Sequence, residues 1–150
     1  MQYYSYEMFR EDIKELLSKL DFNPDGIVAI SRGGLTMAHF LSIALDIRKV
    51  YSISAVSFFN KVQQQIQISN IPEIHGAQRI LIVDEIIDSG VSMEKVLRIL
   101  KEIHTNIEFK TATLFHKSSA SIKPDYFIRE AKDWIEFFWE VDILKDVKEK

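Results

Sequence analysis

The chain has 150 residues, of which 47% are hydrophobic and 27% charged, with a formal net charge of −3 and no cysteine. This length predicts a single domain, residues 1–150, with a substantial core. The composition excludes a disulfide framework, a thiolate metal site and a general nucleic-acid surface. The longest apolar stretch, residues 35–45, is too short for a transmembrane segment. No apolar signal-peptide core appears near the start, so a cytoplasmic protein is expected.

The first half of the chain alternates helical and strand patterns. A helix capped by Ser5 is predicted by five apolar residues on one face: Phe9, Ile13, Leu16, Leu17 and Leu20. A short strand at residues 27–30 and a helix from about Leu35 to Leu45 follow. Residues 50–58 are β-branched and aromatic and predict another strand. The glutamine-rich stretch at 60–70 has no period and predicts a mobile loop or a weak hairpin.

The second half is organised around an apolar run, Ile80 to Val83, which suits a strand buried on both faces of a parallel sheet. A helix is predicted after it, as far as Ile103. Residues 108–115 and 125–128 predict two more strands, before an aromatic segment at 134–139 and a charged tail. This alternation predicts an α/β fold with a mostly parallel, twisted sheet flanked by helices.

Three acids and two serines follow the central strand, in the order Asp84-Glu85-Ile86-Ile87-Asp88-Ser89-Gly90-Val91-Ser92. A loop between a strand's carboxyl end and a helix's amino end is where open α/β sheets bind ligands. Free N–H groups and hydroxyls there suit a phosphate, whereas the acids must face hydroxyls, a metal or a proton. The pattern predicts a site for a phosphorylated sugar. The alternative, an ordinary capped turn, needs one polar residue and not this ordered set.

A second strand-end loop, Ser31-Arg32-Gly33-Gly34, also has phosphate chemistry. Paired glycines free successive N–H groups for an anion, and Arg32 offers a charged fork. By itself the loop is more typical of a glycine turn with a solvated arginine. The phosphate-binding interpretation is strengthened because the loop precedes a helix and the same chain contains the acidic motif.

Residues 83–92 resemble the phosphoribosyl-diphosphate (PRPP) motif of type I phosphoribosyltransferases, and the chain is most similar to their bacterial xanthine-guanine branch. The similarity continues through Lys117, which follows a strand, then Asp125-Tyr126 and Trp134-Ile135-Glu136. Without the resemblance, Lys117 fits a solvated edge residue and Trp134 a core or interface aromatic. The resemblance implies the type I fold with a small C-terminal base-binding hood.

The resemblance also implies roles for the site residues. Ribose and 5′-phosphate contacts are implied for Asp84, Glu85, Ile86, Ile87, Asp88, Ser89, Gly90, Val91 and Ser92. Diphosphate binding is implied for Ser31, Arg32, Gly33 and Gly34, with a cis peptide near the start of this loop. Base binding is implied for Lys117, Trp134 and the Ile135 main chain. Asp88 is the implied catalytic proton acceptor, at purine N7. Mg²⁺ is expected at Glu85 and Asp84, because it bridges diphosphate oxygens using few protein carboxylates.

Several positions depart from the family pattern. Glu85 stands where Asp is usual, and Phe58-Phe59 stands where the lid of residues 51–67 has Ser-Tyr. Gln65 stands where the lid has Arg, with Lys61 as a candidate replacement. The segment between Asp88 and Lys117 is also longer than usual.

The resemblance implies a purine salvage enzyme that moves 5-phosphoribosyl from PRPP to N9 of guanine, xanthine or hypoxanthine, with GMP among the products. Lys117 favours a 6-oxopurine because an ammonium donates to an oxo group. A transferase with another base acceptor remains an alternative, as does a non-catalytic PRPP or nucleotide sensor. A homodimer or homotetramer is expected.

Overall fold

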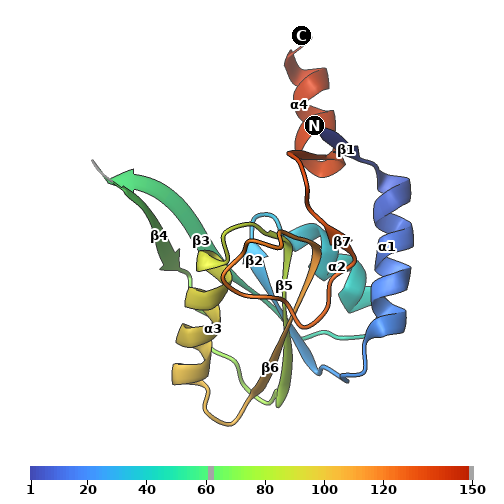
Figure 1. The fold of residues 1–150 in the computed structure, drawn as a ribbon. Helices are drawn as coiled ribbons and strands as arrows, with labels where there is room; N and C mark the ends of the chain where they lie inside the picture. Colours follow the sequence, from blue (N-terminus) through green and yellow to red (C-terminus); the bar gives the residue numbers. More distant parts are fainter. Residues whose placement is uncertain (61–62, 149–150) are drawn as a thin grey trace.

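The computed structural model describes residues 1–60 and 63–148, and its centre is a twisted sheet (Figure 1). Within the described residues this sheet has six strands in the order β4-β3-β2-β5-β6-β7. The strands are β2 (Gly26–Ser31), β3 (Val50–Asn60), β4 (Gln63–Ser69), β5 (Arg79–Ile87), β6 (Glu108–His116) and β7 (Arg129–Glu130). All neighbours pair in parallel except β3 and β4. The predicted α/β fold with a mostly parallel sheet is therefore confirmed.

Helices cover both faces of the sheet. Helices α1 (Tyr6–Lys19) and α2 (Leu35–Ala44) pack on one face, and α3 (Val91–Ile103) packs on the other. The side chains of β5 alternate between these two cores: Leu81 and Val83 belong to the first, Ile80 and Ile82 to the second. This two-sided burial explains why the central strand is apolar at consecutive positions. The Ser5 hydroxyl caps α1, as predicted, by accepting from the Met8 amide at 3.1 Å.

A small second layer joins the two ends of the chain. Strand β1 (Gln2–Tyr4) pairs in parallel with β8 (Ile135–Phe137), and α4 (Phe138–Lys148) follows, at the top of Figure 1. This is the predicted C-terminal hood, completed by an N-terminal strand that the sequence did not reveal. Aromatic rings fill its base, with Tyr4 edge-on to Phe115 and Phe137, and Trp139 stacked on Phe137.

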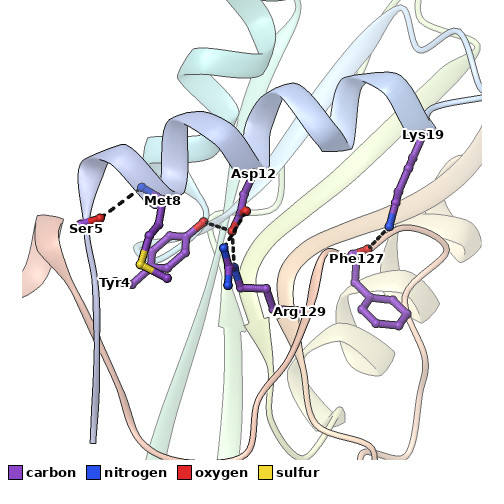
Figure 2. A network of polar contacts seen from close by, with 7 residues as sticks. All are labelled: Tyr4, Ser5, Met8, Asp12, Lys19, Phe127 and Arg129. Atoms are coloured by element: carbon purple, nitrogen blue, oxygen red, sulfur yellow. Dashed lines mark hydrogen bonds and ion pairs between the residues drawn. The ribbon is translucent and has the colours of Figure 1, made fainter.

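A buried carboxylate fastens this layer to the main sheet (Figure 2). Asp12 of α1 is 4% exposed. It accepts from the Tyr4 hydroxyl at 2.6 Å and from Arg129 of β7 through Nε at 2.7 Å and Nη2 at 3.1 Å. Burial, with the bond to Asp12, raises the pKa of Tyr4, while the Asp12 bond raises the pKa of Arg129. One side chain thus joins β1, α1 and β7.

Three segments differ from the sequence prediction. The glutamine-rich stretch forms β4, so the hairpin alternative is correct for its described part; Lys61 lies outside the described residues. The strand predicted at residues 125–128 is reduced to one parallel bridge between Tyr126 and Ala112 of β6, and β7 begins only at Arg129. The Thr111 amide donates to the Asp125 carboxylate at 2.8 Å. The charged tail is helical as far as α4 extends. No helix in the described part of the chain has the length and apolar character needed to cross a membrane.

Candidate active site

A cavity of about 310 Å³ opens at the carboxyl ends of β2 and β5. It is lined by Ile30 to Gly33, Ala55, Asp84 to Gly90, Ser92 and Met93. Both predicted phosphate loops therefore meet in one crevice, where a parallel sheet places its ligand sites. Of the residues predicted to bind diphosphate (31–34) and PRPP (84–92), Gly34 and Val91 do not line the cavity.

The start of α3 offers main-chain donors to this crevice. Gly90 caps the helix with a φ of +95°, a conformation that glycine adopts without strain. The first helical hydrogen bond runs from the Glu94 amide to the Gly90 carbonyl, at 3.0 Å. The amides of Gly90, Ser92 and Met93 come before this bond and have no acceptor within the helix. Val91 instead donates to the Ser89 hydroxyl at 3.3 Å. The geometry suits a phosphate at the helix start.

The second loop, at residues 31–34, packs tightly against the first. The peptide bond between Ser31 and Arg32 is cis, as the family resemblance implied. A Cβ on Gly34 would lie 2.4 Å from the Val83 carbonyl, so only glycine lets this loop approach β5. The Gly34 amide donates to the Ile30 carbonyl at 2.9 Å. An anion in the crevice would consequently meet the loop through Ser31 to Gly33 and not through Gly34.

The two adjacent acids lie side by side at the end of β5. The Glu85 amide donates to Asp84 Oδ1 at 2.9 Å. Burial raises the pKa of both carboxyls, and the neighbouring Glu85 charge raises that of Asp84 further. A Cβ on Gly33 would lie 1.2 Å from Glu85 Oε2, so the glycine makes the space that this carboxyl occupies.

The oxygen donors of Glu85 and Asp84 suit Mg²⁺. Glu85 Oε2 is buried and has no hydrogen-bond partner in the described part of the chain, as expected of a carboxylate awaiting a cation. Residues 1–60 and 63–148 contain no cluster of three or more metal-ligating side chains. A site of one or two carboxylates suits Mg²⁺, which takes its remaining ligands from phosphates and water. The residues present fit the ion.

None of the three predicted base residues lines the cavity, but Lys117 contacts Asp88, which does. Lys117 Nζ is 2.7 Å from Asp88 Oδ1, which joins the predicted base contact to the predicted proton acceptor. Trp134 is 72% exposed, whereas the Ile135 side chain is buried. The Gln2 amide donates to the Trp134 carbonyl at 2.8 Å, and Gln2 lies opposite Ile135. In a parallel ladder this directs the Ile135 N–H and C=O away from β1, where they are open to another partner.

Two further residues escaped sequence reasoning. Ser121 contacts the phosphate loop by donating to the Ser89 carbonyl. Glu140, at the start of α4, lies near enough to Glu85 for its charge to raise the pKa of that carboxyl. Burial raises the pKa of Glu140 itself, against the opposing charge of Arg32. No local pattern marks either residue, because only the fold brings each one near residues that line the crevice.

The model of the phosphoribosyl transferase domain matches residues 2–146. The chain belongs to the phosphoribosyl transferase family. A curated relative, the xanthine-guanine phosphoribosyltransferase of Cereibacter sphaeroides, is 33% identical, over 91% of this chain and 85% of the relative. The family assignment made from residues 83–92 is thereby confirmed.

Solved structures of the family agree with this architecture. The Helicobacter pylori xanthine-guanine-hypoxanthine phosphoribosyltransferase is 44% identical, with a TM-score of 0.92 over 99% of both chains. A purine phosphoribosyltransferase from Pyrococcus horikoshii is 34% identical, with a TM-score of 0.80 over 92% of both chains. The similarity covers the sheet and the hood together, so the predicted type I phosphoribosyltransferase fold is confirmed.

Proposed function

We propose that this protein is a purine salvage enzyme that transfers 5-phosphoribosyl from PRPP to N9 of a 6-oxopurine. The observation that carries the proposal is the contact between Asp88 and Lys117, 2.7 Å apart at the edge of a phosphate-binding crevice. The relatives named above act on purines of this class, which supports the assignment.

The Asp88–Lys117 pair matches one edge of a purine. N7 and O6 are neighbours on the major-groove edge of guanine, hypoxanthine and xanthine. A carboxylate accepts a proton, and an ammonium only donates, so Asp88 fits N7–H and Lys117 fits O6. Adenine would present an amino group to Lys117, which is a donor facing a donor. The alternative acceptors adenine, orotate and uracil fit this pair less well.

PRPP would occupy the crevice in one orientation. Its 5′-phosphate would sit at the start of α3, on the amides of Gly90, Ser92 and Met93. Asp84 and Glu85 would face the ribose hydroxyls. The diphosphate would lie against Ser31, Arg32 and Gly33. Mg²⁺, held by Glu85 and Asp84, would supply charge neutralisation for the departing diphosphate.

The reaction would form the bond from N9 to the anomeric carbon and break the bond from that carbon to the diphosphate. Positive charge develops on the ribose, as in glycoside cleavage, and the carboxylates beside it stabilise this charge. Asp88 accepts the proton that the purine gives up at N7. General-base assistance of this kind contributes about 10²- to 10⁴-fold in rate.

A lid would protect PRPP from water. The β3–β4 hairpin projects from the sheet (Figure 1), and its inner end reaches the cavity at Ala55. Phe58 and Gln65 are cross-strand partners in this hairpin. Closure of this predicted lid, residues 51–67, over the crevice would exclude water from the reacting carbon.

The decisive experiment supplies the protein with PRPP, MgCl₂ and one acceptor at a time: guanine, xanthine, hypoxanthine, adenine, orotate or uracil. Diphosphate release and the nucleotide product are then measured. Release with 6-oxopurines alone supports the proposal. Release with another base moves the protein to a different acceptor class. Binding of PRPP without release from any acceptor identifies a sensor. Omission of MgCl₂, with EDTA present, tests the metal requirement.

A homodimer or homotetramer and a cytoplasmic location complete the proposal. Large apolar side chains are exposed on α2, including Phe40 at 40% and Ile43 at 71%, and Tyr6 lies in the same groove. A second copy of the chain would cover them. Light scattering of wild type and Ile43→Glu tests this, with a lower mass expected for the variant. A monomeric wild type would contradict it.

A further inference from the structure

The loop that carries Lys117 also touches the phosphate loop. Its far end, Ser121, makes two bonds to one oxygen: the Ser121 amide lies 2.9 Å and the Ser121 hydroxyl 3.1 Å from the Ser89 carbonyl, and both donate to it. Ser121 itself is absent from the cavity lining, whereas Ser89 and Gly90 are part of it. The two donors therefore hold the Ser89 carbonyl on the side away from the crevice.

The planarity of the peptide bond turns this contact into a directional one. The Ser89 C=O and the Gly90 N–H belong to the same peptide unit, which is trans. In a trans peptide these two groups point in opposite directions. Fixing the carbonyl toward Ser121 therefore aims the Gly90 N–H toward the crevice, where the phosphate of a ligand would be bound.

The two loops approach closely at Gly90, which has no side chain. A Cβ on Gly90 would lie 2.5 Å from the Ser121 hydroxyl oxygen and 3.0 Å from the Ser121 and Ile122 nitrogens. The Ser121 end is also tied to the Lys117 end of its own loop. The Lys117 amide donates to the Ile87 carbonyl, and the Ala120 amide to the Lys117 carbonyl, each at 3.0 Å.

We infer that Ser121 is a positioning residue that orients the Ser89–Gly90 peptide so that the Gly90 amide binds the 5′-phosphate of PRPP and of the nucleotide product. This rests on the proposed function. The Ser121 hydroxyl adds a second hydrogen bond to the Ser89 carbonyl, so it restricts the orientation of this peptide more than the Ser121 amide does alone. Its contribution is to phosphate affinity and not to the chemical step.

The test compares Ser121→Ala with two matched variants. Ser121→Thr keeps the hydroxyl, and Ser119→Ala removes an exposed serine from the same loop. The Michaelis constant for PRPP and the dissociation constant of GMP, the latter measured by calorimetry without turnover, are expected to rise about 3- to 10-fold in Ser121→Ala, the usual effect of one hydrogen bond. The kcat and the Michaelis constant for guanine should stay within about twofold. Ser121→Thr should restore GMP affinity, and Ser119→Ala should match wild type.

Unchanged PRPP and GMP constants in Ser121→Ala would overturn the inference. So would equal losses for PRPP and guanine with a lowered melting temperature, since these indicate a general structural role. A wild type that binds GMP but transfers no phosphoribosyl group would refute the proposed function alone. The calorimetric comparison of Ser121→Ala with wild type would still decide the role of Ser121 in that case.

Discussion

The two sides of the proposed substrate site are built in contrasting ways. The proposed phosphate side consists of residues 31–33 and 84–92, from two adjacent strands at the centre of the sheet. The proposed acceptor side consists of Lys117 on a loop, with Trp134 and Ile135 at the start of a strand pair made from both chain ends. The first side depends on main-chain geometry that neighbouring residues dictate. The second depends on distant anchors, chiefly Asp12 and Arg129.

The strongest test of this contrast is Asp88→Asn, because Asp88 is where the two sides touch. The amide cannot take up the purine proton, so kcat should fall about 10²- to 10⁴-fold. The dissociation constant of PRPP should change by less than about threefold, since the main-chain phosphate site is unaltered. Rapid-quench turnover and calorimetry give the two numbers. Asp46→Asn is the control, because Asp46 lies in the turn after α2 with a φ of 52°, which Asn also adopts. Wild-type turnover in Asp88→Asn would remove Asp88 from the proton-acceptor role.

Lys117→Ala should affect the acceptor side alone. Losing one charged donor to O6 should lower kcat/KM for guanine and hypoxanthine by about 10- to 100-fold. Residual activity with adenine should not fall, because adenine gains nothing from an ammonium. Competition between the acceptors measures the ratio directly. Lys123→Ala serves as the control, since Lys123 lies over the Phe127 ring in the same segment. An equal loss with every acceptor would place Lys117 outside the base site.

Asp12→Ala should weaken the anchor of the acceptor side. The change leaves the Tyr4 hydroxyl and Arg129 without their partner, although Arg129 is 37% exposed and regains water. The free energy of unfolding should fall by about 2 kcal/mol, less than for a fully buried pair. The Michaelis constant for the purine should rise more than that for PRPP. Urea unfolding and steady-state kinetics check both, with Glu11→Ala on the exposed face of α1 as control. Equal increases would mean that the anchor supports both sides.

Asp84→Asn should show that the phosphate side lowers the stability of the protein, because it buries an ionisable carboxyl. Burial raises the pKa of Asp84 in the folded protein, so above about pH 4, and as far as that raised pKa, the folded state holds more protons than the unfolded state. The contribution of Asp84 to the free energy of unfolding of the unliganded wild type therefore falls as pH rises. The variant lacks this loss and should be about 1 kcal/mol more stable than wild type at pH 7, with no gain at pH 3. Urea titrations across this range test it, with exposed Glu102→Gln as control. A variant less stable than wild type at pH 7 would contradict the burial effect.

The same contrast explains what the sequence revealed. Strand β5, the phosphate loop and the Ser5 cap were predicted because each is encoded in consecutive residues. Strand β1 was missed because its three residues have no pattern and their partner is near the other end of the chain. The role of Asp12 was invisible for the same reason, since Arg129 is 117 positions away. The strand expected at 125–128 is reduced to a single bridge at Tyr126, because the Thr111 amide donates to the Asp125 side chain and not to a main-chain carbonyl.

The pairing of β1 with β8 also sets an order of assembly during translation. Gln2 emerges from the ribosome early but has to wait for Ile135 before its strand can form. Residues 26–103, which contain every cavity-lining residue, are synthesised before that partner exists. The last residue that lines the crevice is therefore synthesised well before the residues that complete the β1–β8 layer. For the same reason, a fusion tag placed before Gln2 is expected to disturb purine affinity before it disturbs PRPP affinity.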